Sequence, residues 1–303
     1  MLGFGRYNYE SFKSEFISKA GLTRFSGGPE PGDAAPDFEG YNLEGEKVAL
    51  DDFRGEQNLV LSFGSATCPA TAASIGPLNE LYEEYKDSDE VAFVFVYVRE
   101  AHPGEKLPGH RSFREKVRAA ELFREEEYVD IPILVDSLEG RIHRAYGKAP
   151  NPTYVIDKSG HIAFRCLWTQ ADVIADALEA LVEDGAERAV VEGGEDTSLP
   201  VASAVVHTHR ALERGGERAI ENFRSEMGRP GRLAETASRV MGPIAMHPER
   251  AIAGAAIAAG VIAAGLFAGF RLRQARCRRS QDPYRYASGG PGDDSDDGYA
   301  VGI

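Results

Sequence analysis

A single cysteine, Cys68, lies in the segment FGSATCPAT (63–71), directly after the apolar run NLVLSF and directly before Pro69. Proline favours the first turn of a helix, so this pattern predicts a strand that ends in a cysteine at a helix N-terminus. The helix dipole and the free N–H groups at such a position stabilise a thiolate and lower the pKa of the cysteine. We therefore predict a reactive thiol with a lowered pKa; the alternative is a buried structural cysteine.

A second group of polar residues follows the apolar run VAFVFVYV (91–98), where Glu100 and His102 stand in the sequence REAH. Both apolar runs predict central parallel strands, whose carboxyl ends meet at one edge of the sheet. An imidazole exchanges protons near neutral pH, and a carboxylate beside it can orient it. We predict that His102 and Glu100 act as a proton relay beside Cys68; the alternative for His102 is a solvated loop histidine.

The other two cysteines give no recognisable motif. Cys166 lies in a predicted edge strand, where a buried inert thiol is favoured over a resolving partner for Cys68. Cys277 follows a long apolar segment, a position compatible with lipidation. The wide spacing of the three cysteines excludes a disulfide scaffold and predicts no metal site.

Composition excludes one broad class of function. The chain has 303 residues, 43% of them hydrophobic, and a formal net charge of −14. This charge disfavours a general nucleic-acid binder, and we predict none as a partner. The first residues, MLGFGRYNYESFKSEF, carry charges where a secretory signal needs an apolar core, so no signal peptide is predicted.

The elements that position Cys68 and His102 alternate between strand and helix, which predicts an α/β domain over residues 36–183 with a central mixed sheet and helices on both faces. The strands are expected at 46–50, 58–63, 91–98, 132–135, 153–157 and 161–165. The helices are expected at 70–86, 111–127, 137–146 and 171–183.

The remaining segments predict accessory elements around this domain. Residues 1–30 hold a predicted amphipathic helix, from the spacing of Tyr9, Phe12, Phe16, Ile17 and Ala20, and a linker. Residues 185–250 predict a Gly- and acid-rich linker and a helical stalk, with a polar helix at 201–228. Residues 271–303 predict a basic and then acidic disordered tail.

Between the stalk and the tail, residues 251–270 read AIAGAAIAAGVIAAGLFAGF, without one charge. This length spans a bilayer core, so we predict a C-terminal transmembrane anchor; the alternative is a buried alanine-rich helix. The following arginines favour a cytoplasmic tail, whereas the missing signal peptide favours a cytoplasmic redox domain, the orientation we prefer. Small residues four apart are compatible with a homodimer through this helix.

Several stretches together resemble a known family. GDAAPDFEGYNLEGEKVALDDFRGEQNLVLSFGSATCP and PTYVIDKSGHIAF resemble the opening and closing segments of a redoxin-type thioredoxin-like fold. Within that superfamily, FGSATCP, VYVREAHPGE, LPGHRS and LVDSLEGRIHRAYG resemble motifs of the iodothyronine deiodinases, in the family's order. The likeness covers residues 36–183, and cysteine stands where the animal enzymes carry selenocysteine.

The resemblance implies roles for individual residues. Cys68 matches the nucleophile, while Tyr97, Glu100 and His102 match substrate and proton-relay positions. The resemblance implies that four further residues also line the substrate site: Ser65, Thr67, His110 and Pro152. It also implies that the bond before Pro152 is cis. An arginine with which the family holds its substrate has no clear counterpart here, although Arg165 is near in sequence.

These features lead to one preferred function and three alternatives. The resemblance implies a membrane-tethered oxidoreductase in which the Cys68 thiolate attacks an iodinated phenol or another soft electrophile. It needs no bound cofactor, and an external thiol or a thioredoxin-type donor regenerates it. The first alternative is a one-cysteine peroxidase, suggested by Ser65 three residues before Cys68 but opposed by Leu61 at the place of the peroxiredoxin proline. A dithiol exchanger is disfavoured by Thr71 at the second-cysteine position, and the last alternative is a non-catalytic thioredoxin-fold interaction module.

Overall fold

The computed structural model describes residues 7–15, 24–182 and 198–245. Seven strands form one sheet in the order β2-β1-β5-β4-β3-β6-β7. The strands are β1 (Glu39–Asn42), β2 (Lys47–Ala49), β3 (Asn58–Gly64), β4 (Val91–Tyr97), β5 (Ile133–Val135), β6 (Thr153–Ile156) and β7 (Ile162–Cys166). The six strands expected from the sequence are therefore present. The additional strand β1 escaped prediction because it has four residues, none of them fully buried.

The centre of the sheet has the arrangement that the two apolar runs predicted. β3 and β4 pair in parallel, with Gly64 opposite Tyr97 at their carboxyl ends, and β5 continues the parallel set beside β4. β6 pairs antiparallel with β3 on its other side, so the sheet is mixed. The loops that carry Cys68 and His102 thus leave the same edge of the sheet.

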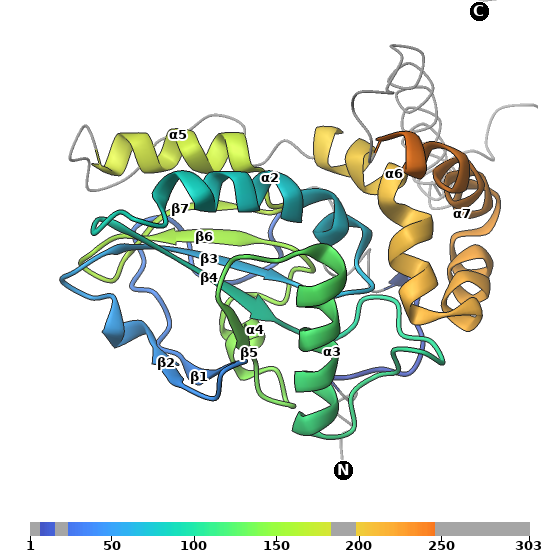
Figure 1. Ribbon diagram of the computed structural model, residues 1–303, viewed down its shortest axis with the longest axis horizontal. Helices are drawn as coiled ribbons and strands as arrows, with labels where there is room; N and C mark the ends of the chain where they lie inside the picture. The colour runs from blue at the N-terminus through green and yellow to red at the C-terminus, as the bar shows by residue number, and fades with distance from the viewer. Residues whose placement is uncertain (1–6, 16–23, 183–197, 246–303) are drawn as a thin grey trace, which may run out of the picture. The chain divides into compact units, whose positions relative to one another are not determined.

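Helices cover both faces of this sheet (Figure 1). One face packs against α2 (Pro69–Tyr85), α3 (Phe113–Glu127) and α5 (Ala171–Val182), in a core that includes Val60 and Phe95. The other face packs against α4 (Arg141–Ala145), in a core that includes Leu61 and Phe63. Because successive residues of β3 point to opposite faces, this one strand contributes to both cores.

Two helices beyond the sheet differ from the predicted stalk. α6 (Ser198–Gly215) and α7 (Glu217–Ala245) pack against each other, and α6 also packs against α2. The chain reverses at Gly216, which has a φ of 99°, and α7 is kinked at Gly228. We call these two helices, residues 198–245, the α6–α7 hairpin. The prediction of a stalk was wrong in these residues, because the thin apolar stripe of α6 is buried against its neighbours.

The N-terminal segment also differs from its prediction. Residues 7–13 are irregular rather than helical, and only Ser14 and Glu15 of the described part are helical. Tertiary contacts explain the difference, since Tyr7 bonds to His143 and Phe12 packs on His102. Aromatic residues that satisfy a helical spacing are used here to attach an extended segment to the domain.

Among the residues that the structure describes, no helix is both long enough and apolar enough to cross a bilayer. The predicted span at 251–270 and the predicted tail at 271–303 lie outside the described residues.

Candidate active site

Cys68 is the N-cap residue of α2, at the end of the loop that follows β3. Its backbone N–H donates to the Ser65 carbonyl at 3.2 Å, and its own carbonyl accepts from Ala72 at 3.0 Å. Pro69 occupies the first helical turn, as predicted. The thiol lies beside the free N–H groups of Ala70 and Thr71, which favour a thiolate.

The environment of the thiol nevertheless differs from the prediction. Cys68 is only 4% exposed and packs against Ala149, Leu167 and Trp168, with Ala204 of α6 alongside. Burial raises the pKa of Cys68 and outweighs the N–H groups of the helix terminus, which act in the opposite direction. The prediction of a lowered pKa was wrong, because apolar residues from distant segments bury the thiol and no local pattern around Cys68 indicates them.

Glu100 is the centre of a buried hydrogen-bond network at the end of β4. One oxygen accepts from the Thr67 backbone N–H at 3.0 Å and from its hydroxyl at 2.7 Å. The other accepts a short hydrogen bond from the Tyr97 hydroxyl and lies 3.4 Å from His110 Nε2. Burial alone would raise the pKa of Glu100, but His110, Tyr97 and Thr67 together hold it below its ordinary value. The network therefore keeps an ionised carboxylate close to the Cys68 loop.

Two hydroxyl groups join the Cys68 loop to the turn after β4. The Thr67 hydroxyl, besides donating to Glu100, accepts from the His102 backbone N–H at 3.0 Å. The Ser65 hydroxyl accepts from the Ala101 N–H at 3.2 Å. Both side chains are buried, so in this conformation Ser65 and Thr67 position the two loops. Their predicted contacts with a substrate stay a prediction.

His102 lies at the expected edge of the sheet but is covered by aromatic rings. Its ring centroid is 4.4 Å from that of Phe12 and 5.4 Å from that of Phe223, a residue of α7. The side chain is 7% exposed, and Nδ1 has no hydrogen-bond partner. Burial lowers the pKa of His102 to about 3, although the Glu100 carboxylate acts to raise it. His102 is thus a neutral imidazole whose Nδ1 has no hydrogen-bond partner within the described segments.

Pro152 stands immediately before β6, as expected, but the peptide bond before it is trans. No cis peptide bond occurs in the described segments, so the expected cis bond is a wrong prediction. The trans backbone is extended and fully paired here: the Pro152 carbonyl accepts from Phe63 at 3.0 Å and the Asn151 carbonyl accepts from Thr169 at 2.9 Å.

Cys166 is fully buried in β7, at the edge of the sheet, as the sequence indicated. Burial raises its pKa to about 12. Both Cys68 and Cys166 are free thiols in this structure.

The N-terminal segment contributes residues that the sequence did not indicate. The Tyr9 hydroxyl donates to the Ala101 carbonyl at 3.0 Å, beside the Cys68 loop. The guanidinium of Arg99 lies 4.9 Å from the ring centroids of both Tyr7 and Tyr9. The only signal for these contacts was the run of aromatic residues near the start of the chain, which resembles a helix stripe equally well.

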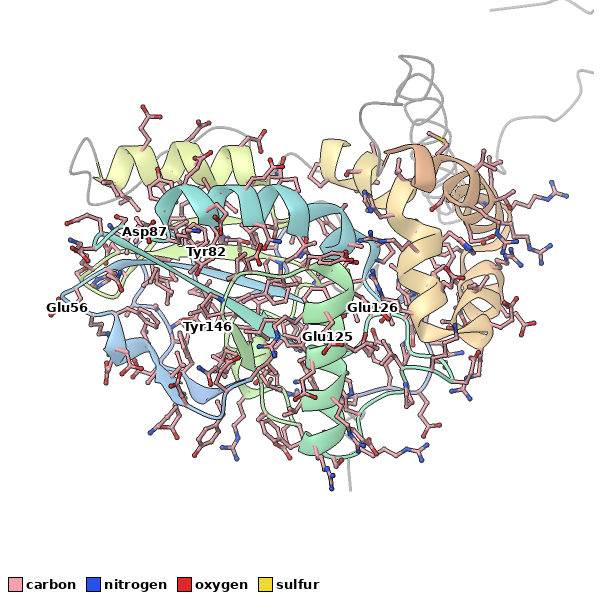
Figure 2. The ribbon with its side chains drawn as sticks, in the orientation of Figure 1. Glu56, Tyr82, Asp87, Glu125, Glu126 and Tyr146 are labelled. Atoms are coloured by element: carbon pink, nitrogen blue, oxygen red, sulfur yellow. The ribbon has the colours of Figure 1, made fainter. Side chains whose placement is uncertain are left out.

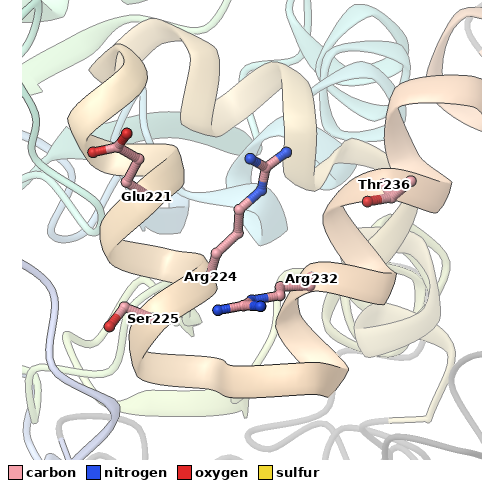
Figure 3. Close-up of a pocket in the computed structure, with 5 residues that line it drawn as sticks. All are labelled: Glu221, Arg224, Ser225, Arg232 and Thr236. Carbon is pink, nitrogen blue, oxygen red and sulfur yellow. The ribbon is translucent and has the colours of Figure 1, made fainter.

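Two hollows on the surface of the α6–α7 hairpin lie apart from these residues. One is lined by five residues of α7, including Arg224 and Arg232 (Figure 3). The other is lined by residues of α6, α7 and the 105–106 loop. Neither is lined by Cys68 or His102.

Comparison with known proteins agrees with this arrangement. The family model described as iodothyronine deiodinase matches residues 7–169. Thyroxine 5-deiodinase of Gallus gallus is 33% identical over 138 residues, which cover 42% of this chain and 52% of that protein. Type I iodothyronine deiodinase of Xenopus laevis is 28% identical over 143 residues, covering 44% and 55%. The chain thus spans about half the length of the curated relatives it matches.

Among solved structures, a putative thiol:disulfide interchange protein DsbE from Chlorobium tepidum has 22% sequence identity and a TM-score of 0.40, covering 52% of this chain and 97% of that one. The strand order and the buried Cys68–Glu100 site described above give the chain a thioredoxin-like α/β fold, and the family match includes every predicted site residue. The chain belongs to the iodothyronine deiodinase family.

Proposed function

We propose that this protein is a thiol-dependent reductive dehalogenase acting on an iodinated phenol, with Cys68 as the nucleophile. The observation that carries the proposal is the link through Thr67, which joins the Cys68 loop directly to the Glu100 carboxylate and to the His102 backbone. The loop that carries the nucleophile is thereby joined to the turn that carries Glu100 and His102.

The reaction balances with two equivalents of an external thiol. The Cys68 thiolate attacks iodine, the sulfur–iodine bond forms, and the electron pair of the carbon–iodine bond passes to the ring carbon, which takes a proton. One external thiol then displaces iodide from sulfur and leaves a mixed disulfide. A second thiol releases Cys68, so the donor is oxidised by two electrons to a disulfide and one proton is released.

The neighbouring residues support these steps in different ways. His102 is neutral before the reaction, so it takes the proton that the Cys68 thiol loses and then passes this proton to the ring carbon. Glu100 fixes the turn on which His102 stands and contributes negative charge that favours a protonated imidazole. Tyr97 and His110 hold Glu100 in place and act through it. The free N–H groups of Ala70 and Thr71 stabilise the thiolate.

Iodide release tests the proposal directly. The purified full chain is incubated with an iodinated phenol and dithiothreitol, and free iodide is measured. Replacement of Cys68 by Ser should abolish release, whereas Cys166→Ser, a change at the other buried thiol, should retain it. Iodide release that survives in Cys68→Ser contradicts the proposal. Hydrogen peroxide in place of the phenol, with sulfenic acid on Cys68 as readout, tests the peroxidase alternative.

We further propose that residues 36–183 form the redox domain of a membrane-anchored protein, with residues 251–270 as the anchor and the redox domain on the cytoplasmic side. The support for the anchor is the length of this segment and its lack of charge. An alkaline carbonate wash of membranes should leave the full chain in the pellet. Protease treatment of sealed vesicles then reports the orientation, and recovery of the protein in the wash contradicts the anchor.

A further inference from the structure

The α6–α7 hairpin covers both reactive groups of the candidate site. Ala204 of α6 packs on the cluster that buries Cys68. Phe223 of α7 packs on the ring of His102, in a cluster with Phe12, Leu212 and Ile220. The hairpin lies outside the part of the chain that the family model matches, residues 7–169. The groups that the proposed reaction requires are thus covered by a segment added to the family domain.

His102 shows that this covered state is not one in which a proton is exchanged with substrate. A buried polar atom without a hydrogen-bond partner costs free energy, and Nδ1 of His102 is such an atom. The face of the ring is occupied by Phe12 and its other neighbour is Phe223, in a T-shaped contact with planes 80° apart. The position of Phe223 beside His102 is therefore one that the aromatic ring of a phenolic substrate also fits.

Ion pairs and hydrogen bonds, besides the apolar contacts, hold the hairpin on the domain. Arg210 and Arg214 of α6 form ion pairs with Glu127 of α3, and Arg214 also pairs at 2.8 Å with Glu126, which is labelled in Figure 2. Arg214 Nη1 donates to the Ala66 carbonyl at 3.2 Å, in the loop that leads to Cys68. Polar interfaces between parts of one chain resemble those of transient complexes and separate more readily than apolar cores.

The backbone of the hairpin directly contacts the backbone of the turn after His102. The Lys106 N–H donates to the Gly215 carbonyl at 3.0 Å, and the exposed Glu105 carboxylate accepts from the first N–H groups of α7, Glu217 at 2.7 Å and Arg218 at 2.9 Å. A Cβ on Gly104 would collide with the Gly215 carbonyl and meet Ala219 Cβ at 3.1 Å. The three atoms nearest to this Cβ all belong to the hairpin, so a methyl group there acts first on this contact.

We propose that the α6–α7 hairpin is an autoinhibitory lid, which must move away before a substrate can reach Cys68 and replace Phe223 beside His102. The inference rests on the proposed function for the identity of the reactive groups. Burial under the closed lid also agrees with the raised pKa of Cys68 and the lowered pKa of His102, since burial disfavours the charged form of each side chain.

The lid is tested by the rate at which iodoacetamide alkylates Cys68 in the full chain, measured by mass spectrometry of the Cys68 peptide. In Gly104→Ala, the added methyl group overpacks the contact with the hairpin and shifts the equilibrium from the closed to the open lid. The alkylation rate of Cys68 should therefore rise by ~5- to ~150-fold. The matched control is Gly76→Ala, the same change at an exposed position of α2 where a Cβ meets nothing within 4 Å. It should leave the alkylation rate within ~2-fold of the parent. Phe223→Ala should also raise the rate, through loss of hairpin packing.

Two measurements keep the test decisive whether or not the variants fold. Circular dichroism tests whether each variant is folded. If Gly104→Ala and Phe223→Ala are folded and Cys68 is alkylated in them at the same rate as in the parent, the lid proposal is overturned. Hydrogen exchange on the unmodified chain needs no variant: the amides of α6 and α7 should exchange faster than those of β3 and β4. Equal exchange would mean that the hairpin opens only on global unfolding, which also overturns it. Neither measurement uses a substrate, so each is independent of iodide release.

Discussion

Two buried histidines should make this protein unusually sensitive to mild acid. Burial lowers the pKa of His102 and of His143 to about 3 from an ordinary value of 6.5. The His143 ring accepts from the Tyr7 hydroxyl at 2.6 Å through Nδ1 and donates to the Ala149 carbonyl at 2.8 Å through Nε2. The unfolded chain therefore binds more protons than the folded chain between these two pKa values, so stability rises with pH across this window and falls on acidification.

The size of the effect follows from the two pKa values. One proton of difference is worth ~1.4 kcal/mol per pH unit. From about pH 6.5 to about pH 5.0, each unfolded histidine passes from half to nearly full protonation, so each lowers the free energy of unfolding by ~1.6 kcal/mol and both by ~3 kcal/mol. Urea denaturation at these two pH values measures the difference, with fluorescence of Trp168, the single tryptophan of the chain, as the probe.

Two variants separate the histidines from other titrating groups. His143→Gln and His102→Gln keep a neutral polar side chain of similar size, and each should lose about half of the acid-induced fall. The double variant should lose the contribution of both residues, and Gly76→Ala should retain it; burial also lowers the pKa of His207, which both variants keep. A fall of the same size in the parent and in the double variant would refute the reasoning, because other groups would then cause the acid sensitivity.

Three further predictions concern the candidate site. Glu100→Gln removes a buried charge from four donors, so we expect the free energy of unfolding to drop by ~3–5 kcal/mol in urea denaturation; a drop below ~0.5 kcal/mol would contradict a central role. Because burial raises the pKa of Cys68, its alkylation in the parent should have a midpoint above that of a free cysteine, and a midpoint below ~8.5 would show that the helix terminus dominates. His102→Ala should slow iodide release by ~10²–10⁴-fold while the alkylation rate of Cys68 does not fall, and unchanged release would exclude it as the proton donor.

Local patterns were sufficient to predict the centre of the fold. β3 and β4 are apolar at nearly every position, as strands covered on both faces must be, and their parallel pairing was expected from the helix between them. Cys68 at a helix N-cap followed from its position between an apolar run and Pro69. The meeting of the Cys68 loop with Glu100 followed from the shared edge of the two strands.

Contacts between distant segments were not predictable in the same way. The cluster that buries Cys68 includes Leu167 and Trp168 and is packed against Ala204, residues some 100 to 136 positions further along the chain, and none of them has a local feature that identifies its neighbour. Tyr9 and Phe12 fit a helical spacing, yet their rings serve tertiary contacts of an irregular segment. The trans bond before Pro152 likewise differs from what the family resemblance implied, because backbone pairing on both sides accommodates it.

The hydrogen-bond network around Glu100 has a consequence for how such a protein can evolve. Every donor to this carboxylate belongs to the Cys68 loop, to β4 or to the 102–112 loop, and none belongs to the α6–α7 hairpin. The hydrogen bonds that hold Glu100 are therefore supplied by the family domain, whereas the hairpin adds to the burial of the reactive groups. A different covering segment on the same domain would therefore change access to the site and the pKa values of Cys68 and His102, while the hydrogen bonds to Glu100 would stay the same.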